Sequence, residues 1–362
     1  MEVFRMFRCV LIILCLTGTQ ASGMDAEPVT TLFRGASDAS AAVALTEEIV
    51  VVADDETNVL RAYRIRDVGL PIWQRPLDAF LGSDPEHPEA DIEAGARIGN
   101  RIYWISSHGR NKDGKIRSSR YRFFATTVRK QGDSLTLLPE GNAYRHLAHD
   151  LTQLTSAGPL GLVQSTRLHE TLKGQQRSRL APKKEGFNIE GLCASEDGSV
   201  LYIGFRNPRP LRRALVIPLL NPDAVVMRGV KPLFGKPLLW GLQGLGIRSM
   251  TYAQAHRAYF IVAGAHDAAS GFHLYRWSGQ RTELPKYVCA VGDTVDDFTP
   301  EALVAFEKSR RLWIASDDGS RRVRVNTAQD CLPDTSFANG MCENKHLKDP
   351  LRRTFRSLWL EP

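Results

Sequence analysis

The sequence predicts an all-β fold, a β-propeller of five four-stranded blades most of all, with six blades as the alternative. The first reason is a cassette that occurs five times: a polar residue, an apolar stretch, a turn, and a second apolar strand about a dozen residues later. The key polar positions of the five copies are Ser40, Glu93, Glu190, Arg248 and Glu301.

The second reason is the spacing of these copies. The steps between key positions are 53, 97, 58 and 53 residues, and three of them match the length of a four-stranded propeller blade with generous loops. The third reason is the composition, because 43% hydrophobic and 24% charged residues are ordinary values for one folded body.

The strands of the blades follow from apolar stretches bounded by Gly, Asn, Asp and Pro turns. The first blade contains the second-strand motif VVVAD near residues 50–54. The strands expected for blades two, three and four span 93–98, 101–107, 122–128, 135–138; 188–194, 200–205, 213–220, 224–230; and 248–253, 258–264, 272–278, 282–288.

The fifth blade is irregular. Residues 301–306 and 311–316 are clear strands, 321–325 is short, and a loop with two cysteines intervenes before the strand at 355–360. The N-terminal segment 29–34 offers a strand that completes this blade. Such pairing of the two chain ends closes the ring and removes exposed sheet edges.

The long step between Glu93 and Glu190 requires an insertion. Residues from about 144 to 185 have leucines at mixed helical spacing and few β-branched runs, so they predict a partly helical insertion over one face. A sixth, degenerate blade is the alternative, although no cassette recurs there.

The first 23 residues have the pattern of a secretory signal peptide. Arg5 and Arg8 precede an apolar run at 9–16, and small residues follow at 21–23. The apolar run is too short to span a bilayer, and no later segment is long enough. We therefore expect one domain over 24–362, secreted or periplasmic and not membrane-spanning.

Export affects how the cysteines are interpreted. Cys193, Cys289, Cys331 and Cys342 remain after cleavage, in a compartment where disulfides persist. Cys331 and Cys342 bracket a short loop, and we predict a disulfide between them. The spacings do not match a zinc site, and Cys193 is expected to be a buried, unreactive thiol.

The formal net charge is +7, with arginines and lysines concentrated in loops near 110–122, 177–184 and 206–213. This charge favours an anionic small molecule or an envelope component as partner. Solvated loop faces are the simpler interpretation of the basic clusters, and export argues against nucleic acid.

The key cassette positions predict a ring of charged side chains, because inner strands line the channel of a propeller. Glu93, Glu190 and Glu301 would converge with Arg248, and a cation such as calcium would relieve their repulsion. Ser40 and Arg248 would contact the ligand. Side chains that cap backbone amides and lock blade to blade are the structural alternative.

A second set of polar residues follows the second strands: Asp54, Asp55, His108, Arg206, His266, Asp267, Asp317 and Asp318. His108 is the candidate general base near neutral pH. Spacing alone leaves open whether this set shares a face with the first ring. If it does, Arg206 and Arg248 would hold a phosphate or carboxylate beside the acids.

Several blocks of sequence resemble a bacterial family, domain of unknown function 3616. These are SDASAAVAL with VADDETNVLRAY, DIEAGARIGNRIYWISSHGRNKDG, NIEGLCASEDGSVLYIGFRNP, and GIRSMTY with FHLYRWSG. The recurring Glu-Gly or Glu-Ala cassette is also similar to that of phytase-like and esterase-like propellers. The second resemblance implies hydrolase activity by analogy of fold and assigns no catalytic residue.

Two functional classes follow from these observations. One is a hydrolase of phosphate or carboxylate esters, metal-assisted, in which Glu93, Glu190 and Glu301 hold a cation or act as acid and base and His108 relays a proton. The other is a non-catalytic envelope propeller that binds an anionic ligand or a protein partner and whose acid ring is structural.

Overall fold

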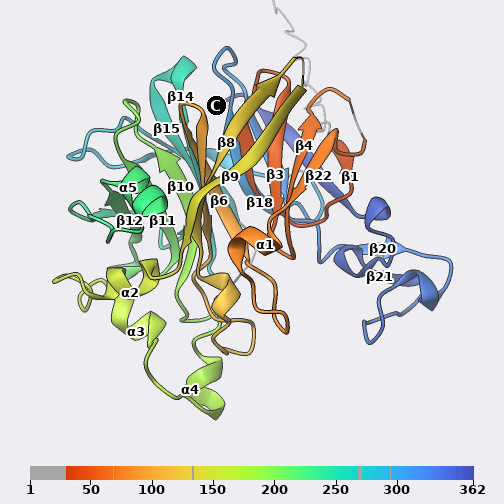
Figure 1. Cartoon of the computed structure of the whole chain (residues 1–362), viewed down its shortest axis with the longest axis horizontal. Coiled ribbons are helices and arrows are strands. Elements are labelled where there is room, and N and C mark those ends of the chain that lie inside the picture. The colour runs from red at the N-terminus through yellow and green to blue at the C-terminus, as the bar shows by residue number, and fades with distance from the viewer. Residues whose placement is uncertain (1–29, 68, 133, 268–270, 294) are drawn as a thin grey trace, which may run out of the picture.

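The structure is a computed structural model that describes residues 30–67, 69–132, 134–267, 271–293 and 295–362 (Figure 1). The predicted signal peptide lies outside these residues. No helix in the described part of the chain is both long and apolar enough to cross a membrane.

Five antiparallel four-stranded sheets form the five blades of a β-propeller, as the sequence predicted, and the alternative of six blades is excluded. Each innermost strand contacts the innermost strands of two neighbouring blades, so the ring is closed. The first four blades, each from its inner to its outer strand, are β2 (Ala39–Ala44), β3 (Ile49–Asp54), β4 (Thr57–Arg64), β5 (Trp73–Pro76); β6 (Ile92–Ile98), β7 (Arg101–Ser106), β8 (Phe123–Gln131), β9 (Ser134–Tyr144); β10 (Asn188–Ala194), β11 (Leu201–Asn207), β12 (Ala214–Leu219), β13 (Leu238–Trp240); and β14 (Gly246–Ala253), β15 (Ala258–Gly264), β16 (Phe272–Trp277), β17 (Lys286–Val291).

The fifth blade is built from both ends of the chain, which confirms the predicted closure. Its strands are β18 (Pro300–Ala305), β19 (Leu312–Ser316), β22 (Thr354–Leu360) and β1 (Thr31–Arg34). The rings of Phe33 on β1 and Phe355 on β22 stack with centroids 5.0 Å apart, and both side chains are fully buried. The N-terminal strand is therefore held by core packing as well as by its backbone ladder.

Two of the predicted strands, one in blade three and one in blade five, differ in the structure. Residues 224–230 lie mostly in a helix, α5 (Pro222–Arg228), and the outer strand of blade three is β13. Pro222 at the start and Gly229 in the left-handed region at the end delimit this helix, and Val225 and Val226 bury one face. The short strand near 321–325 belongs to a separate hairpin, β20 (Arg322–Arg324) with β21 (Met341–Glu343).

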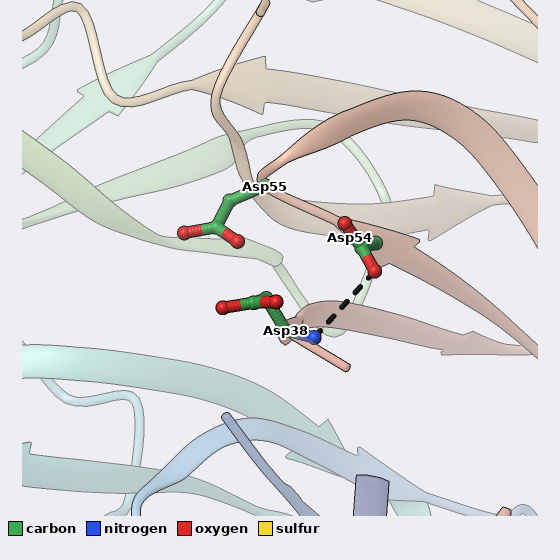
Figure 2. A group of neighbouring side chains, drawn as sticks. All are labelled: Asp38, Asp54 and Asp55. Atoms are coloured by element: carbon green, nitrogen blue, oxygen red, sulfur yellow. Dashed lines mark hydrogen bonds between the residues drawn. The ribbon is translucent and has the colours of Figure 1, made fainter. Parts of the chain in front are cut away.

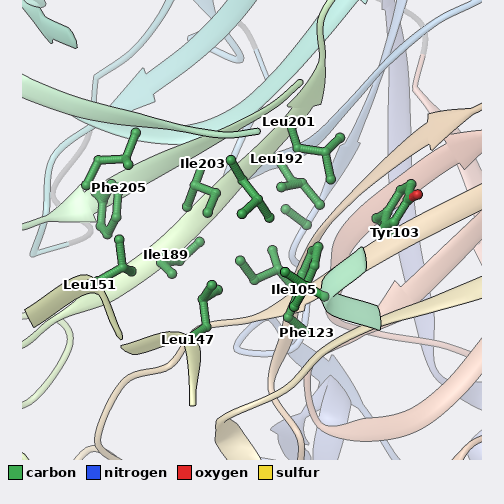
Figure 3. Close-up of a cluster of buried hydrophobic side chains, with 14 of the residues drawn as sticks. Tyr103, Ile105, Phe123, Leu147, Leu151, Ile189, Leu192, Leu201, Ile203 and Phe205 are labelled. Carbon is green, nitrogen blue, oxygen red and sulfur yellow. The ribbon is translucent and has the colours of Figure 1, made fainter. Parts of the chain in front are cut away.

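The segment between β9 and β10 contains three short helices, α2 (Leu147–Thr152), α3 (Leu162–Thr166) and α4 (Gly174–Ser178), and α1 (Asp78–Leu81) precedes β6. Leu147 and Leu151 of α2 are buried with Ile189 and Phe205 of blade three in one hydrophobic cluster (Figure 3). The insertion is thus anchored to the core between blades two and three. Short 3-10 helices span 118–120, 210–212, 254–256, 328–330, 344–346 and 350–352.

Several long connections lie at one end of the channel. The strands alternate in direction, so the turns that follow the first and third strands of a blade lie at one end and those that follow the second and fourth at the other. The second group includes α2 to α4 and the β20–β21 hairpin, which lie on the lower part of the molecule in Figure 1. We call this end, where every innermost strand begins, the entry end.

Candidate functional site at the entry end of the channel

All five key positions of the repeated cassette are β-bulges. In each blade, the pairing of the innermost strand with its neighbour skips one residue, and the skipped residues are Ser40, Glu93, Glu190, Arg248 and Glu301. A bulge leaves one residue unpaired and re-aims its side chain. The repeated cassette in the sequence therefore corresponds to a β-bulge in each blade. The bulge places the side chain of each key position in the ring.

A buried ion-pair network occupies the side of the ring formed by blades three, four and five. Arg206 Nη1 donates to Glu190 Oε1 at 2.7 Å, and Arg248 Nη1 lies 3.1 Å from Glu190 Oε2. Arg248 Nη2 also pairs with Glu301. Arg206 and Arg248 are 3% and 2% exposed, so the two guanidinium groups and two carboxylates compensate one another away from solvent.

The opposite side of the ring is a cluster of carboxylates from blades one and two. Within the described residues, carboxylate oxygens of Asp38, Asp54 and Asp55 lie within 4.8 Å of one another, and so do those of Asp55, Asp91 and Glu93. Asp55 is common to both groups. Figure 2 shows Asp54 and Asp55 at the end of one strand facing Asp38, whose backbone N–H donates to Asp54 Oδ2 at 3.5 Å. We call Asp38, Asp54, Asp55, Asp91 and Glu93 the acid cluster.

The acid cluster is short of compensating charge. Burial raises the pKa of Asp38 well above its usual range, and the charges of Asp317 and Asp54 raise it further. Burial also raises the pKa of Asp55, with added repulsion from Asp38, Asp317 and Glu93. Oδ1 of Asp55 is buried and has no hydrogen-bond partner among the described residues. Such a site favours a proton or a metal cation.

Three cations border the acid cluster. Burial raises the pKa of Asp54, and the charge of Arg61 opposes this increase. Arg120 Nη1 donates to Asp91 Oδ2 at 2.8 Å and also pairs with Glu89. Lys345 Nζ lies 2.6 Å from Glu56 Oε1, and, although burial opposes it, the charges of Glu56 and Asp38 raise the pKa of Lys345. Burial and the charge of Asp91 raise the pKa of Glu89 to about 7. Asp38, Asp54, Asp55 and Glu93 have no ion pair of their own among the described salt bridges.

Glu93 lies where the two sides of the ring meet. Burial raises its pKa well above the usual range, the charges of Asp91 and Glu190 raise it further, and those of Arg248 and Arg206 oppose the increase. The structure therefore divides the three predicted metal ligands. Glu93 joins the acid cluster, whereas Glu190 and Glu301 are engaged by arginines.

Ser40, which the sequence predicts to contact the ligand, makes hydrogen bonds to the backbone. Its hydroxyl donates to the backbone oxygen of Ile92 at 2.6 Å and lies 3.3 Å from that of Ala53. This hydrogen bond joins blade one to blade two. Of the two interpretations given for the ring, blade-to-blade locking describes Ser40.

His108, the predicted general base, is buried, and its backbone N–H donates to the backbone oxygen of Arg120 at 3.0 Å. Its ring packs edge-on against Tyr121, and Nδ1 lies 2.9 Å from the backbone oxygen of Ser106. Nε2 is buried without a partner among the described residues, and burial lowers the pKa of His108 to about 4. The imidazole is neutral at pH 7, and the structure shows no contact between it and Glu190.

This histidine makes stability depend on pH. Between pH 6.5 and about 4 the unfolded chain binds a proton that folded His108 does not, so the folded state should lose about 3 kcal/mol as the pH falls through this window. Above pH 6.5 His108 is neutral in both the folded and the unfolded state, so the folded state keeps its full stability. His108→Asn, which suits the positive φ of 52°, should remove this loss in urea unfolding followed from pH 7 to 4.

Carboxylates with raised pKa values act in the opposite direction in the same range, so the difference between wild type and variant is the quantity to compare. His146→Asn, at an exposed histidine, is the control and should leave the pH profile unchanged. An identical profile for His108→Asn would contradict the prediction.

The predicted disulfide between Cys331 and Cys342 is confirmed, with Cα atoms 6.6 Å apart. It closes the loop of the β20–β21 hairpin, and Val325 and Leu347 pack around it in a small buried cluster. Cys193 and Cys289 are unpaired, and burial raises the pKa of both thiols. The buried thiol expected at Cys193 is therefore present.

A large cavity lies at the other end of the channel. It has a volume of about 790 Å³ and is lined by the middle and far ends of the innermost strands, including Ala42, Gly95, Leu192, Met250 and Leu303. Its walls contain none of the acid cluster or the paired arginines. The 790 Å³ cavity is therefore separate from the charged groups, and we place the site where the charged groups are.

Asp38 and Asp91 are the site residues that sequence reasoning missed. Both carry the clue in the cassette itself, because each stands two places before a key ring position. The sequence predicts Asp54 and Asp55 at the end of a second strand, but the approach of Asp55 to Glu93 joins two blades and is not predictable from spacing. The structure settles that both predicted sets share the entry end.

Comparison with known proteins identifies a family and a fold. Residues 38–295 match the family described as "Protein of unknown function (DUF3616)". A search of curated proteins finds no match. Among solved structures, the glutaminyl cyclase of Myxococcus xanthus is similar at 11% identity and a TM-score of 0.42, covering 79% of this chain and 88% of that one. The PQQ-bound aldose sugar dehydrogenase of Streptomyces coelicolor is similar at 9% identity and 0.39, covering 92% and 100%. We draw no functional inference from values this low.

Proposed function

The chain belongs to the DUF3616 family, and because that family name assigns no activity, we propose from the geometry that the protein is a metal-assisted hydrolase of phosphate or carboxylate esters. The reaction would take place at the entry end of the channel. The calcium ion expected from the sequence is part of this proposal.

One observation carries the proposal: the ring has two chemically opposite sides. In the acid cluster of blades one and two, Asp38, Asp54, Asp55 and Glu93 form none of the described ion pairs, and the arginines of blades three and four retain unpartnered N–H donors at Arg206 Nε, Arg206 Nη2 and Arg248 Nε. Metal-assisted ester hydrolysis uses a cation and hydrogen-bond donors side by side, because negative charge develops on the ester oxygen as water attacks.

The residues divide the work accordingly. Asp38, Asp54 and Asp55 supply the oxygen ligands that a calcium ion prefers. The cation would polarise the ester oxygen, and Arg206 and Arg248 would hold an anionic group of the substrate. Glu93, between the two sides, is the group that we assign to proton transfer, in place of His108.

We also propose that the protein works outside the cytoplasm. The disulfide between Cys331 and Cys342 supports this location, because such bonds persist in oxidising compartments. The signal-like sequence at 1–23 supports it independently.

The test is a turnover screen on the chain from residue 24 onward. p-Nitrophenyl phosphate, p-nitrophenyl acetate and simple lactones are assayed with calcium and with a chelator. We expect turnover that the chelator abolishes, and a loss of roughly 100-fold or more in kcat for Glu93→Gln, the usual contribution of a general acid or base. The control, Glu86→Gln, changes an exposed carboxylate in the loop before β6 and should be neutral.

A non-catalytic binding propeller is the second candidate. It is favoured by the burial of the ring and by the position of the 790 Å³ cavity at the other end of the channel. Calcium binding without turnover of any ester in the screen would exclude the hydrolase and select this function.

A further inference from the structure

The guanidinium group of Arg206 has a free edge. One of its nitrogens, Nη1, donates to Glu190 at 2.7 Å, but Nε and Nη2 are buried and have no hydrogen-bond partner among the described residues. These two nitrogens form one side of the planar guanidinium fork, which presents two parallel N–H donors. Leaving them unsatisfied costs free energy, so the site is built to receive an acceptor.

The fork is fixed in place. Arg206 lies in β11, its side chain is 4% exposed, and Glu190 is itself held by the amide of Asn188, whose Nδ2 donates to Glu190 Oε1 at 2.7 Å. Arg248, paired with the same glutamate, adds a third buried donor at Nε. Because Arg206 Nη1 is already paired with Glu190, the guanidinium group is held rigidly and can bind a planar pair of oxygens through its other two nitrogens without reorganisation.

The surrounding charge selects the kind of anion. Arg206 and Arg248 are matched by Glu190 and Glu301, so this network has no excess positive charge. Arg209 adds one positive charge nearby. Burial and the charge of Arg212 lower the pKa of Arg209, and the charge of Asp267 opposes this decrease. A group with a single negative charge therefore fits this side of the ring better than a dianion, whose second charge would be uncompensated.

We infer that the Nε and Nη2 edge of Arg206 binds a carboxylate, so that the ligand of this site is a small carboxylic acid or an ester that carries a free carboxylate. Two oxygens of one carboxylate match the two parallel donors, and Arg248 Nε contributes beside them. Calling this ligand the substrate rests on the proposed function, whereas the binding site itself does not.

The experiment is calorimetric titration of the chain from residue 24 onward with acetate, with succinate and with inorganic phosphate, each matched for ionic strength. We expect acetate or succinate to bind more tightly than phosphate. Arg206→Lys should weaken carboxylate binding at least 10-fold, because lysine keeps the charge but has no fork. Arg213→Lys, at an exposed arginine before β12, is the matched control and should bind as wild type does.

Arg206→Gln is a second variant, to be used if the lysine variant fails to fold. It is chosen because the glutamine amide can still reach Glu190. Tighter binding of phosphate than of either carboxylate would overturn the inference, as would wild-type carboxylate affinity in folded Arg206→Lys or Arg206→Gln. Asp55→Asn, which alters only the cation side, should retain carboxylate binding. Carboxylate binding without ester turnover would therefore reject the proposed hydrolase and leave this site standing.

Discussion

Asp55→Asn is expected to make the metal-free protein more stable and to abolish its stabilisation by calcium. Asp55 is common to both groups of converging carboxylates, and Oδ1 has no partner. The neutral amide removes the repulsion with Asp38, Asp317 and Glu93, so the metal-free variant should be more stable than metal-free wild type. The same change removes a calcium ligand from the centre of the cluster.

The measurement is scanning calorimetry with elemental analysis, with and without a chelator. Wild type should retain calcium, lose it to the chelator and melt at a lower temperature afterwards, because a ligand that binds the folded state stabilises it. The variant should melt higher than metal-free wild type and show no response to calcium. Asp113→Asn, at an exposed aspartate, is the control. A calcium response in Asp55→Asn equal to that of wild type would remove Asp55 from the site.

Arg248→Met is expected to be the most destabilising single change at the ring. Burial and the charge of Arg206 lower the pKa of Arg248 to about 10, so the group is still charged at neutral pH. Its removal leaves Glu301 buried without its cation and Glu190 with one arginine partner in place of two. Breaking a buried pair in this way costs about 3–5 kcal/mol.

Urea unfolding checks this expectation. Adding Glu301→Gln to Arg248→Met should restore part of the lost stability, because the glutamine carries no charge to bury. Arg276→Met alters an exposed arginine in the same blade and should change stability by about 0.5 kcal/mol or less. A small change in the free energy of unfolding for Arg248→Met would contradict this expectation. It would show that solvent reaches Glu301 and stabilises its charge without the arginine.

The sequence by itself determined the five blades, their closure by the N-terminal strand, the disulfide and the ring of key positions. Each of these depends on a local pattern: alternating apolar strands, turn residues, cysteines close in the chain, and a cassette repeated once per blade. Even the failure at 224–230 was local, because the Pro and Gly that delimit α5 were present in the sequence.

Only the tertiary structure decided how the ring divides. Glu190 and Glu301 face arginines, whereas Glu93 groups with Asp55 and Asp91, and nothing in the spacing distinguishes the three glutamates. The contacts of Glu93 with Asp55 and of Glu301 with Arg248 join residues of different blades, so they depend on the curvature of the closed ring. The state of a buried charge is set by neighbours that the sequence places far away, which is why the opposed acidic and basic sides became visible only in the folded molecule.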